Sequence, residues 1–102
     1  MRIQPEKRGI IMPMLFMIIE HFKQADLRPV AERFNHSGRM LPDGVIYHAS
    51  WIDPKAVRCF QIMEAPDPEA LELWIHRWND LVDFEVVPVV TSADFWAKAD
   101  LI

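Results

Sequence analysis

The chain has 102 residues, 51% hydrophobic and 25% charged, with a formal net charge of −4. This size and composition predict one small globular domain and exclude two. The excess of acidic residues, without a stripe of Lys and Arg, argues against binding to nucleic acid, and no apolar run reaches the roughly 20 residues that cross a bilayer. We therefore expect neither nucleic acid nor a membrane as a partner.

The first 13 residues are expected to form a tail outside the domain, which then spans residues 14–102. Three basic residues precede the apolar run 10–19, as in a secretory signal, but Pro13 interrupts the run and no small-residue cleavage site follows it. Cys59 is the only cysteine, so no internal disulfide can form, and a cytoplasmic setting is expected.

The first half of the chain predicts a strand, a helix and a hairpin. The β-branched and aromatic run 15–22 predicts a strand that Met14 opens. Asp26 is expected to cap a helix that ends at Gly38, with Pro29 in its first turn. Its apolar positions follow the i, i+3, i+4, i+7 pattern: Leu27, Val30, Ala31 and Phe34. The turn Pro42-Asp43-Gly44 precedes a strand at 45–52, and the connection 53–56 leads to its hairpin partner at 57–64.

The second half predicts a helix, a strand and a short terminal helix. Asp67 followed by Pro68 indicates a helix start. The helix carries an apolar stripe of helical period: Leu71, Trp74, Ile75, Trp78, Leu81 and Val82. A strand at 84–91 contains Pro88, which lacks the N–H that a central strand needs, so this strand is expected at a sheet edge. Ser92 is expected to cap a terminal helix whose exposed Trp96 contacts a partner subunit.

This order of elements predicts an α+β fold of the ferredoxin-like βαββαβ type, with an antiparallel sheet and two helices on one face. The other face is expected to be too apolar to remain in water, because the strands 15–22 and 84–91 are apolar on both sides. Two sheets packed face to face would form a homodimer, a dimeric α/β barrel.

Several segments resemble a small bacterial family known only as a domain of unknown function, which belongs with the dimeric α/β-barrel proteins. They are MLFMIIEHF, SWID, RCFQIME, WNDLVDFEVVPV and TSA, in that order from Met14 to about Ala93. Relatives in the wider superfamily include cofactor-free monooxygenases of antibiotic synthesis, isomerases of aromatic degradation, haem-degrading enzymes and stress-response proteins. These relatives share no catalytic set that could be transferred to this chain.

The register of the predicted hairpin decides which side chains face the barrel interior. A loop of two or four residues pairs Ile52 with Val57 and places four polar residues on the interior face. They are His48, Ser50, Cys59 and Gln61. The helix face then receives an apolar set: Val45, Tyr47, Ala49, Trp51, Phe60 and Ile62. A three-residue loop would reverse this partition, with Trp51 opposite Cys59 and Tyr47 opposite Met63.

The first strand is expected to direct Phe16, Ile18 and Phe22 to the helices and His21 to the interior, where Glu85 also points. The candidate catalytic residues are His21 and His48, because imidazole titrates near neutral pH. The candidate ligand-binding residues are Ser50, Cys59, Gln61 and Glu85. The alternative is that each histidine only forms hydrogen bonds within the sheet or the dimer interface.

Other kinds of site find little support in the sequence. Glu20 is adjacent to His21, but neighbouring side chains of a strand point to opposite faces and do not pair. The four histidines show no metal-ligand spacing, and the chain has neither a second thiol nor a Gly-rich phosphate loop, so no metal and no cofactor are predicted. Trp74 and Trp78 are expected in the core rather than in a haem wall. Cys59 is expected to be a small core residue rather than a nucleophile.

The leading hypothesis is a homodimer whose barrel binds a small, largely apolar organic ligand, with proton transfer or cofactor-free oxidation if the protein is an enzyme. The alternative is a non-catalytic dimerisation or stress-related module with a packed barrel. A cavity of a few hundred cubic ångströms with convergent polar groups would favour the ligand site, and a packed interior would favour the module.

Overall fold

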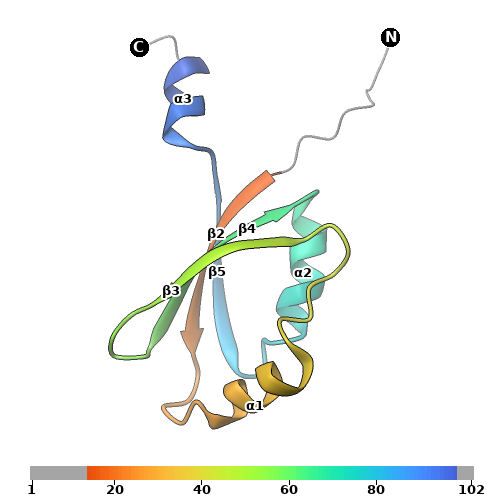
Figure 1. The fold of residues 1–102 in the computed structure, drawn as a ribbon, viewed down its shortest axis with the longest axis vertical. Helices are drawn as coiled ribbons and strands as arrows, with labels where there is room; N and C mark the ends of the chain where they lie inside the picture. The colour runs from red at the N-terminus through yellow and green to blue at the C-terminus, as the bar shows by residue number, and fades with distance from the viewer. Residues whose placement is uncertain (1–13, 99–102) are drawn as a thin grey trace.

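The computed structural model describes residues 14–98, and the expected tail lies outside them. The elements are β2 (Met14–Phe22), α1 (Arg28–Ser37), β3 (Ile46–Ile52), β4 (Arg58–Ala65), α2 (Pro68–His76), β5 (Val82–Val89) and α3 (Ser92–Lys98). The four strands form one antiparallel sheet in the order β3-β4-β2-β5 (Figure 1). This is the predicted α+β fold with ferredoxin-like topology, in which the first and third strands are central.

The helix α1 begins one residue later than a cap at Asp26 would place it. The Asp26 carboxylate accepts a hydrogen bond from the Arg28 backbone N–H at 3.0 Å and also pairs with the Arg28 side chain, while Leu27 occupies the cap position. Gly38 ends the helix with φ of +66°, as the sequence predicted.

The hairpin β3-β4 combines two registers that are separated by a bulge. Near the loop, Ile52 pairs with Cys59 and Ser50 with Gln61, so the loop is one residue further along the chain than expected. The register shifts at His48, and beyond it Tyr47 pairs with Met63. Because the bulge inserts one residue, even-numbered side chains of β3 face the helices near the loop, and odd-numbered ones face them beyond the bulge. Ser50 and Ile52 are examples of the first group and Tyr47 of the second.

The predicted helix stripe is correct as far as Ile75, and Trp78 is buried in the core although it lies in the turn after the helix. The helix α2 ends at His76, and a turn follows in which the Leu81 and Val82 N–H groups donate to the Trp78 carbonyl. Asn79 and Asp80 lie in this turn, and both residue types favour turns over helix interiors. Val82 therefore opens β5, where its side chain is buried.

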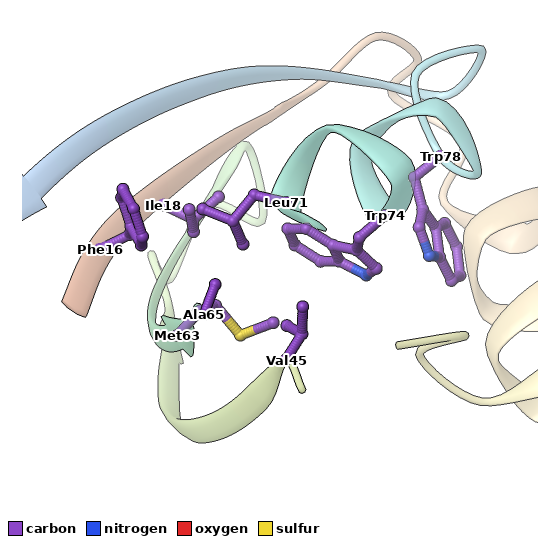
Figure 2. Close-up of a cluster of buried hydrophobic side chains, with 8 residues drawn as sticks. All are labelled: Phe16, Ile18, Val45, Met63, Ala65, Leu71, Trp74 and Trp78. Carbon is purple, nitrogen blue, oxygen red and sulfur yellow. The ribbon is translucent and has the colours of Figure 1, made fainter. Parts of the chain in front are cut away.

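The core lies between α2 and the face of the sheet that carries the even-numbered side chains of β2. Figure 2 shows Leu71 and Trp74 extending from α2 toward the strands. The buried cluster consists of Phe16, Ile18, Val45, Met63, Ala65, Leu71, Trp74 and Trp78. Trp74 and Trp78 are 2% and 6% exposed, which confirms their prediction as core residues.

The opposite face of the sheet, here called the open face, is apolar and partly exposed. Its residues include Leu15, Met17, Ile19, Ile46, Trp51, Phe60, Ile62, Val87 and Val89. Trp51 is 59% exposed and Ile46 49%, which is unusual for residues of this size. The sequence assigned Ala49, Trp51, Phe60 and Ile62 to the helix face, and this assignment is wrong. Ala49 pairs with Ile62 and Trp51 with Phe60 on the open face, because the alternate residues of β4, including Cys59 and Gln61, are the ones buried under the helices.

The strand β5 forms an edge of the sheet, as Pro88 predicted. The helix α3 follows it and lies at the end of the molecule opposite α1 (Figure 1). Its first turn is capped by Thr91 rather than by Ser92, since the Thr91 hydroxyl accepts from the Asp94 N–H at 3.0 Å. Phe95 and Trp96 are 52% and 42% exposed. Among residues 14–98, no helix is long and apolar enough to span a membrane.

Candidate functional site

A cavity of about 340 Å³ lies on the helix side of the sheet, between α1, α2 and the strands. Its wall is mainly apolar and includes Phe22, Val30, Phe34, Ile52, Trp74, Trp78 and Val82. Four polar side chains of the strands and of the segment after α1 join this wall: Glu20, Arg39, Ser50 and Gln61. This volume and this mixture of surfaces are typical of small-molecule sites.

The cavity exists because α1 does not pack closely against the sheet. The predicted apolar stripe of α1 is correct, and all four of its residues line the cavity, yet no residue of α1 is buried. The helix α2 takes the opposite role and fills the core with Leu71 and Trp74. One helix therefore stabilises the sheet while the other encloses a space.

Glu20 is the acidic residue of the cavity wall. The register pairs it with Cys59 in β4 and Phe84 in β5, so it shares the helix face with Phe16 and Ile18. The Gln61 amide nitrogen donates a hydrogen bond to its carboxylate. Burial raises the pKa of Glu20 from 4.5 to about 7, although the Gln61 hydrogen bond and the Arg39 charge act in the opposite direction. A carboxyl with such a pKa accepts and releases protons at neutral pH.

Arg39 is the basic residue of the wall and is positioned by α2 and the turn that follows it. The indole N–H groups of Trp74 and Trp78 both donate to the Arg39 carbonyl, at 3.0 and 2.9 Å. The Arg77 guanidinium donates to the Met40 carbonyl at 2.7 Å. The Arg39 guanidinium lies over the Tyr47 ring at 3.6 Å and over the Phe34 ring at 5.2 Å. These contacts hold the cation between two aromatic rings.

Two further polar groups of the wall, Ser50 and Gln61, are already engaged. Ser50 Oγ and Tyr47 Oη form a hydrogen bond of 2.7 Å. Gln61 is buried, with its amide on Glu20. Burial, followed by the charge of Glu20, raises the pKa of the Cys59 thiol to about 11. The thiol therefore stays protonated at neutral pH, and nucleophilic attack by Cys59 is unfavourable.

The structure brings together three of the six predicted site residues and separates the others from them. Ser50, Cys59 and Gln61 share one face, as expected, but it is the helix face and not the open face. His21 pairs in register with Arg58, one position from the pair that contains Glu20, and thus lies on the open face. The grouping of all six residues in one pocket is wrong.

The two candidate histidines pair with carboxylates of neighbouring strands. His48, at the bulge, lies with Nε2 2.9 Å from Glu64 Oε1. His21 Nε2 lies 3.7 Å from Glu85 Oε1, and both side chains are about half exposed. These contacts agree with the alternative reading, in which each histidine forms polar contacts within the sheet.

Sequence reasoning missed Glu20 and Arg39. Glu20 was considered only as a partner of His21, although its even position placed it with Phe16, Ile18 and Phe22 on the helix face. A carboxylate among core positions is a signal for a functional group, because burial disfavours its charge. Arg39 follows the end of α1 and gave no comparable signal.

Among residues 14–98, no cluster of three or more His, Cys, Asp or Glu side chains could hold a metal ion. The chemistry that the wall offers is proton exchange at Glu20 next to the fixed positive charge of Arg39.

Fold and cavity together define a small ferredoxin-like α+β protein with a mainly apolar cavity on the helix side of its sheet. The chain belongs to the DUF3303 family, a domain of unknown function, which matches residues 14–100. Neither the curated proteins nor the solved structures include a match to this chain.

Proposed function

We propose that this protein binds a small, largely apolar organic molecule in the helix-side cavity and exchanges a proton with it through Glu20. The observation that carries the proposal is the position of this carboxyl in the wall of a 340 Å³ cavity bounded by aromatic and aliphatic side chains. In the reaction, the Glu20 carboxylate takes a proton from a C–H or O–H group of the ligand. It becomes a carboxylic acid and returns the proton to a second atom, so the net change is an isomerisation.

The polar residues around Glu20 support this chemistry. Gln61 holds the carboxyl in place through its amide, and Arg39 supplies a positive charge that stabilises the anion formed when the ligand loses its proton. Neither His21 nor His48 takes part, because both lie on the other face of the sheet.

The proposed assembly is a homodimer in which two open faces pack together. The support is the extent of the apolar surface, which includes the exposed Ile46 and Trp51 on β3 and the exposed Val87 on β5, the two edge strands of the sheet. Large exposed apolar surfaces mark interaction sites in soluble proteins, and a second copy of the same sheet would cover this one. The site then lies inside each subunit, outside the space between the two sheets. The contact of Trp96 with a partner subunit stays a prediction.

The test is calorimetric titration of the full chain with 1-naphthalenemethanol, a neutral molecule with an apolar body and one hydroxyl. Val30→Trp places an indole in the cavity, and Glu32→Trp adds the same side chain two positions away on α1, outside the wall. We expect binding to the wild type and to Glu32→Trp and none to Val30→Trp. Equal binding to both variants would refute the site.

Circular dichroism shows whether Val30→Trp is folded, and Ala31→Leu reduces the same cavity with a smaller side chain if it is not. Native mass spectrometry at two protein concentrations reports the subunit number and any molecule that is purified with the protein. A clean dimer that binds no probe would instead favour the dimerisation module.

A further inference from the structure

We infer that the ligand of the cavity is an organic anion, a carboxylate on a flat apolar body, and that Arg39 recognises its charge. This inference rests on the proposed function, because it names the class of molecule that the same cavity binds. It follows from the hydrogen bonds that the wall has already formed and from the one cation that it leaves available.

Most of the donors near the cavity already have acceptors within the protein. The indole N–H groups of Trp74 and Trp78 are both bound to the Arg39 carbonyl, so these rings offer the ligand only their apolar surfaces. The Ser50 hydroxyl is bound to Tyr47, and the Gln61 amide is bound to Glu20.

The Arg39 guanidinium is different. Among residues 14–98, no carboxylate or carbonyl accepts a hydrogen bond from it, whereas the nearby Arg33 forms two hydrogen bonds with Asp80 and Arg77 donates to Met40. The aromatic rings of Tyr47 and Phe34 contact the guanidinium plane, and stacking on the plane leaves the N–H edge available. A planar cation with a free edge matches the two oxygens of a carboxylate.

The backbone around Arg39 is also built to keep the cation in place. Three donors from α2 and the turn after it hold the carbonyls of Arg39 and Met40, and Met40 has a φ of +58°, in the left-handed region that non-glycine residues seldom adopt. Little ordering of the protein is therefore required when a ligand binds, which favours affinity.

Glu20 completes the recognition of an anion. In its protonated form, the carboxyl group donates a hydrogen bond to the bound carboxylate, next to the contact that Arg39 makes. Burial already favours this form. Binding of an anion therefore draws a proton from the solvent, and Glu20 must release this proton before it acts as the base of the proposed reaction.

The test compares three molecules with the same naphthyl body: 1-naphthoate, 1-naphthalenemethanol and 1-naphthylmethylammonium. They are titrated by calorimetry into the full chain at pH 6.5. We expect the carboxylate to bind about 10- to 100-fold more tightly than the alcohol, and the ammonium ion to bind more weakly than the alcohol. Titrations in two buffers of different ionisation enthalpy should show proton uptake with the carboxylate only.

Three variants assign the preference to Arg39. Arg39→Met removes the charge and keeps an apolar stem, so the carboxylate and the alcohol should bind with equal affinity. Arg39→Lys keeps the charge and should retain a preference of several fold. Arg33→Met is the matched control, because Arg33 also lies over a tryptophan, Trp78, at 5.5 Å but is absent from the cavity wall. It should leave the wild-type preference unchanged.

The outcomes separate this inference from the proposed function. If the alcohol binds in the cavity as tightly as the carboxylate, or if the ammonium ion binds most tightly, the ligand is not an anion and the inference is overturned while the site remains. If none of the three molecules binds, the cavity is not a ligand site and both fail. A preference for the carboxylate that survives in Arg39→Met would assign the recognition to another residue and refute the role of Arg39.

Discussion

Glu20→Gln should make the protein more stable at alkaline pH, although it removes the group that we propose exchanges the proton. Burial raises the pKa of Glu20 from 4.5 to about 7 in the folded state. A carboxyl whose pKa is higher in the folded than in the unfolded state favours folding most below the unfolded value, and this contribution is lost as the pH rises through the folded value. The free energy of unfolding therefore falls between pH 4.5 and about 7.

The size of this effect follows from the two pKa values. At about 1.4 kcal/mol for each pH unit, the interval between 4.5 and about 7 corresponds to about 3 kcal/mol. Glu20 keeps partial contact with solvent, which reduces the effect, so we expect a loss of about 1 to 3 kcal/mol in the wild type. Glutamine has nearly the same shape, is neutral at every pH and still accepts a hydrogen bond from Gln61 through its amide oxygen.

The assay is urea denaturation of both proteins from pH 5 to pH 8 at one chain concentration, since the stability of the proposed dimer would depend on concentration. The difference between the two proteins isolates Glu20 from the other titrating groups. We expect Glu20→Gln to be more stable than the wild type at pH 8 by about 1 to 3 kcal/mol and to lose this advantage at pH 5.

The matched control is Glu72→Gln, which removes a carboxylate from the exposed side of α2, away from both the cavity and the open face. It should change the stability by about 0.5 kcal/mol or less at both pH values. If Glu20→Gln shows the same pH dependence as the wild type, or is less stable at pH 8, then Glu20 is not desolvated and the argument for the site fails.

Three further predictions test the faces of the sheet and the core. His21→Ala and His48→Ala should each leave the affinity for 1-naphthoate within about twofold of the wild type in calorimetry, because neither side chain faces the cavity; a larger loss would place the site on the open face. Val87→Glu places a charge on the open face and should convert a dimer to monomers in sedimentation experiments, whereas an intact dimer would show that this face is not the interface. Leu71→Ala removes a side chain that is 1% exposed and should cost about 2 to 4 kcal/mol in urea denaturation; a cost below about 1 kcal/mol would contradict close packing between α2 and the sheet.

The order of elements was predictable because each has a strong local signal. Asp67 caps α2 by accepting from the Ala70 N–H at 2.9 Å, Pro88 places β5 at the sheet edge, and Gly38 ends α1. These signals depend on a few neighbouring residues and on backbone chemistry alone. Tertiary packing does not need to be known to interpret them.

The faces of the hairpin could not be predicted in the same way. A bulge shifts the register by one residue, and in a strand one residue exchanges the two faces. Nothing in the residues around His48 marks a bulge: no glycine or proline lies in β3. Both registers considered from the sequence occur in part. Near the loop, Ser50, Cys59 and Gln61 share one face, as in the register of an even loop, and beyond the bulge Tyr47 lies opposite Met63, as in the register of a three-residue loop.

The prediction of the faces also used an assumption that the site violates. It assigned the apolar side chains of the hairpin to the helices and the polar ones to the other face. In the structure, Glu20, Ser50 and Gln61 lie under α1 because this helix encloses a cavity, and polar groups in the cavity wall can interact with one another and with a ligand. The large apolar side chains, such as Trp51, lie on the open face.

The polar residues in the cavity wall and the large apolar residues on the open face have the same physical meaning. Placing a carboxyl group in an apolar wall costs stability, and exposing tryptophan and isoleucine on a sheet costs solubility. A chain that only needed to fold would be more stable with a neutral residue at position 20 and a polar residue at position 51. The first cost is explained if Glu20 must change its protonation state at neutral pH, and the second is explained if the open face is covered by another copy of the chain. The rise in stability expected for Glu20→Gln would therefore be direct evidence that position 20 serves a function other than folding.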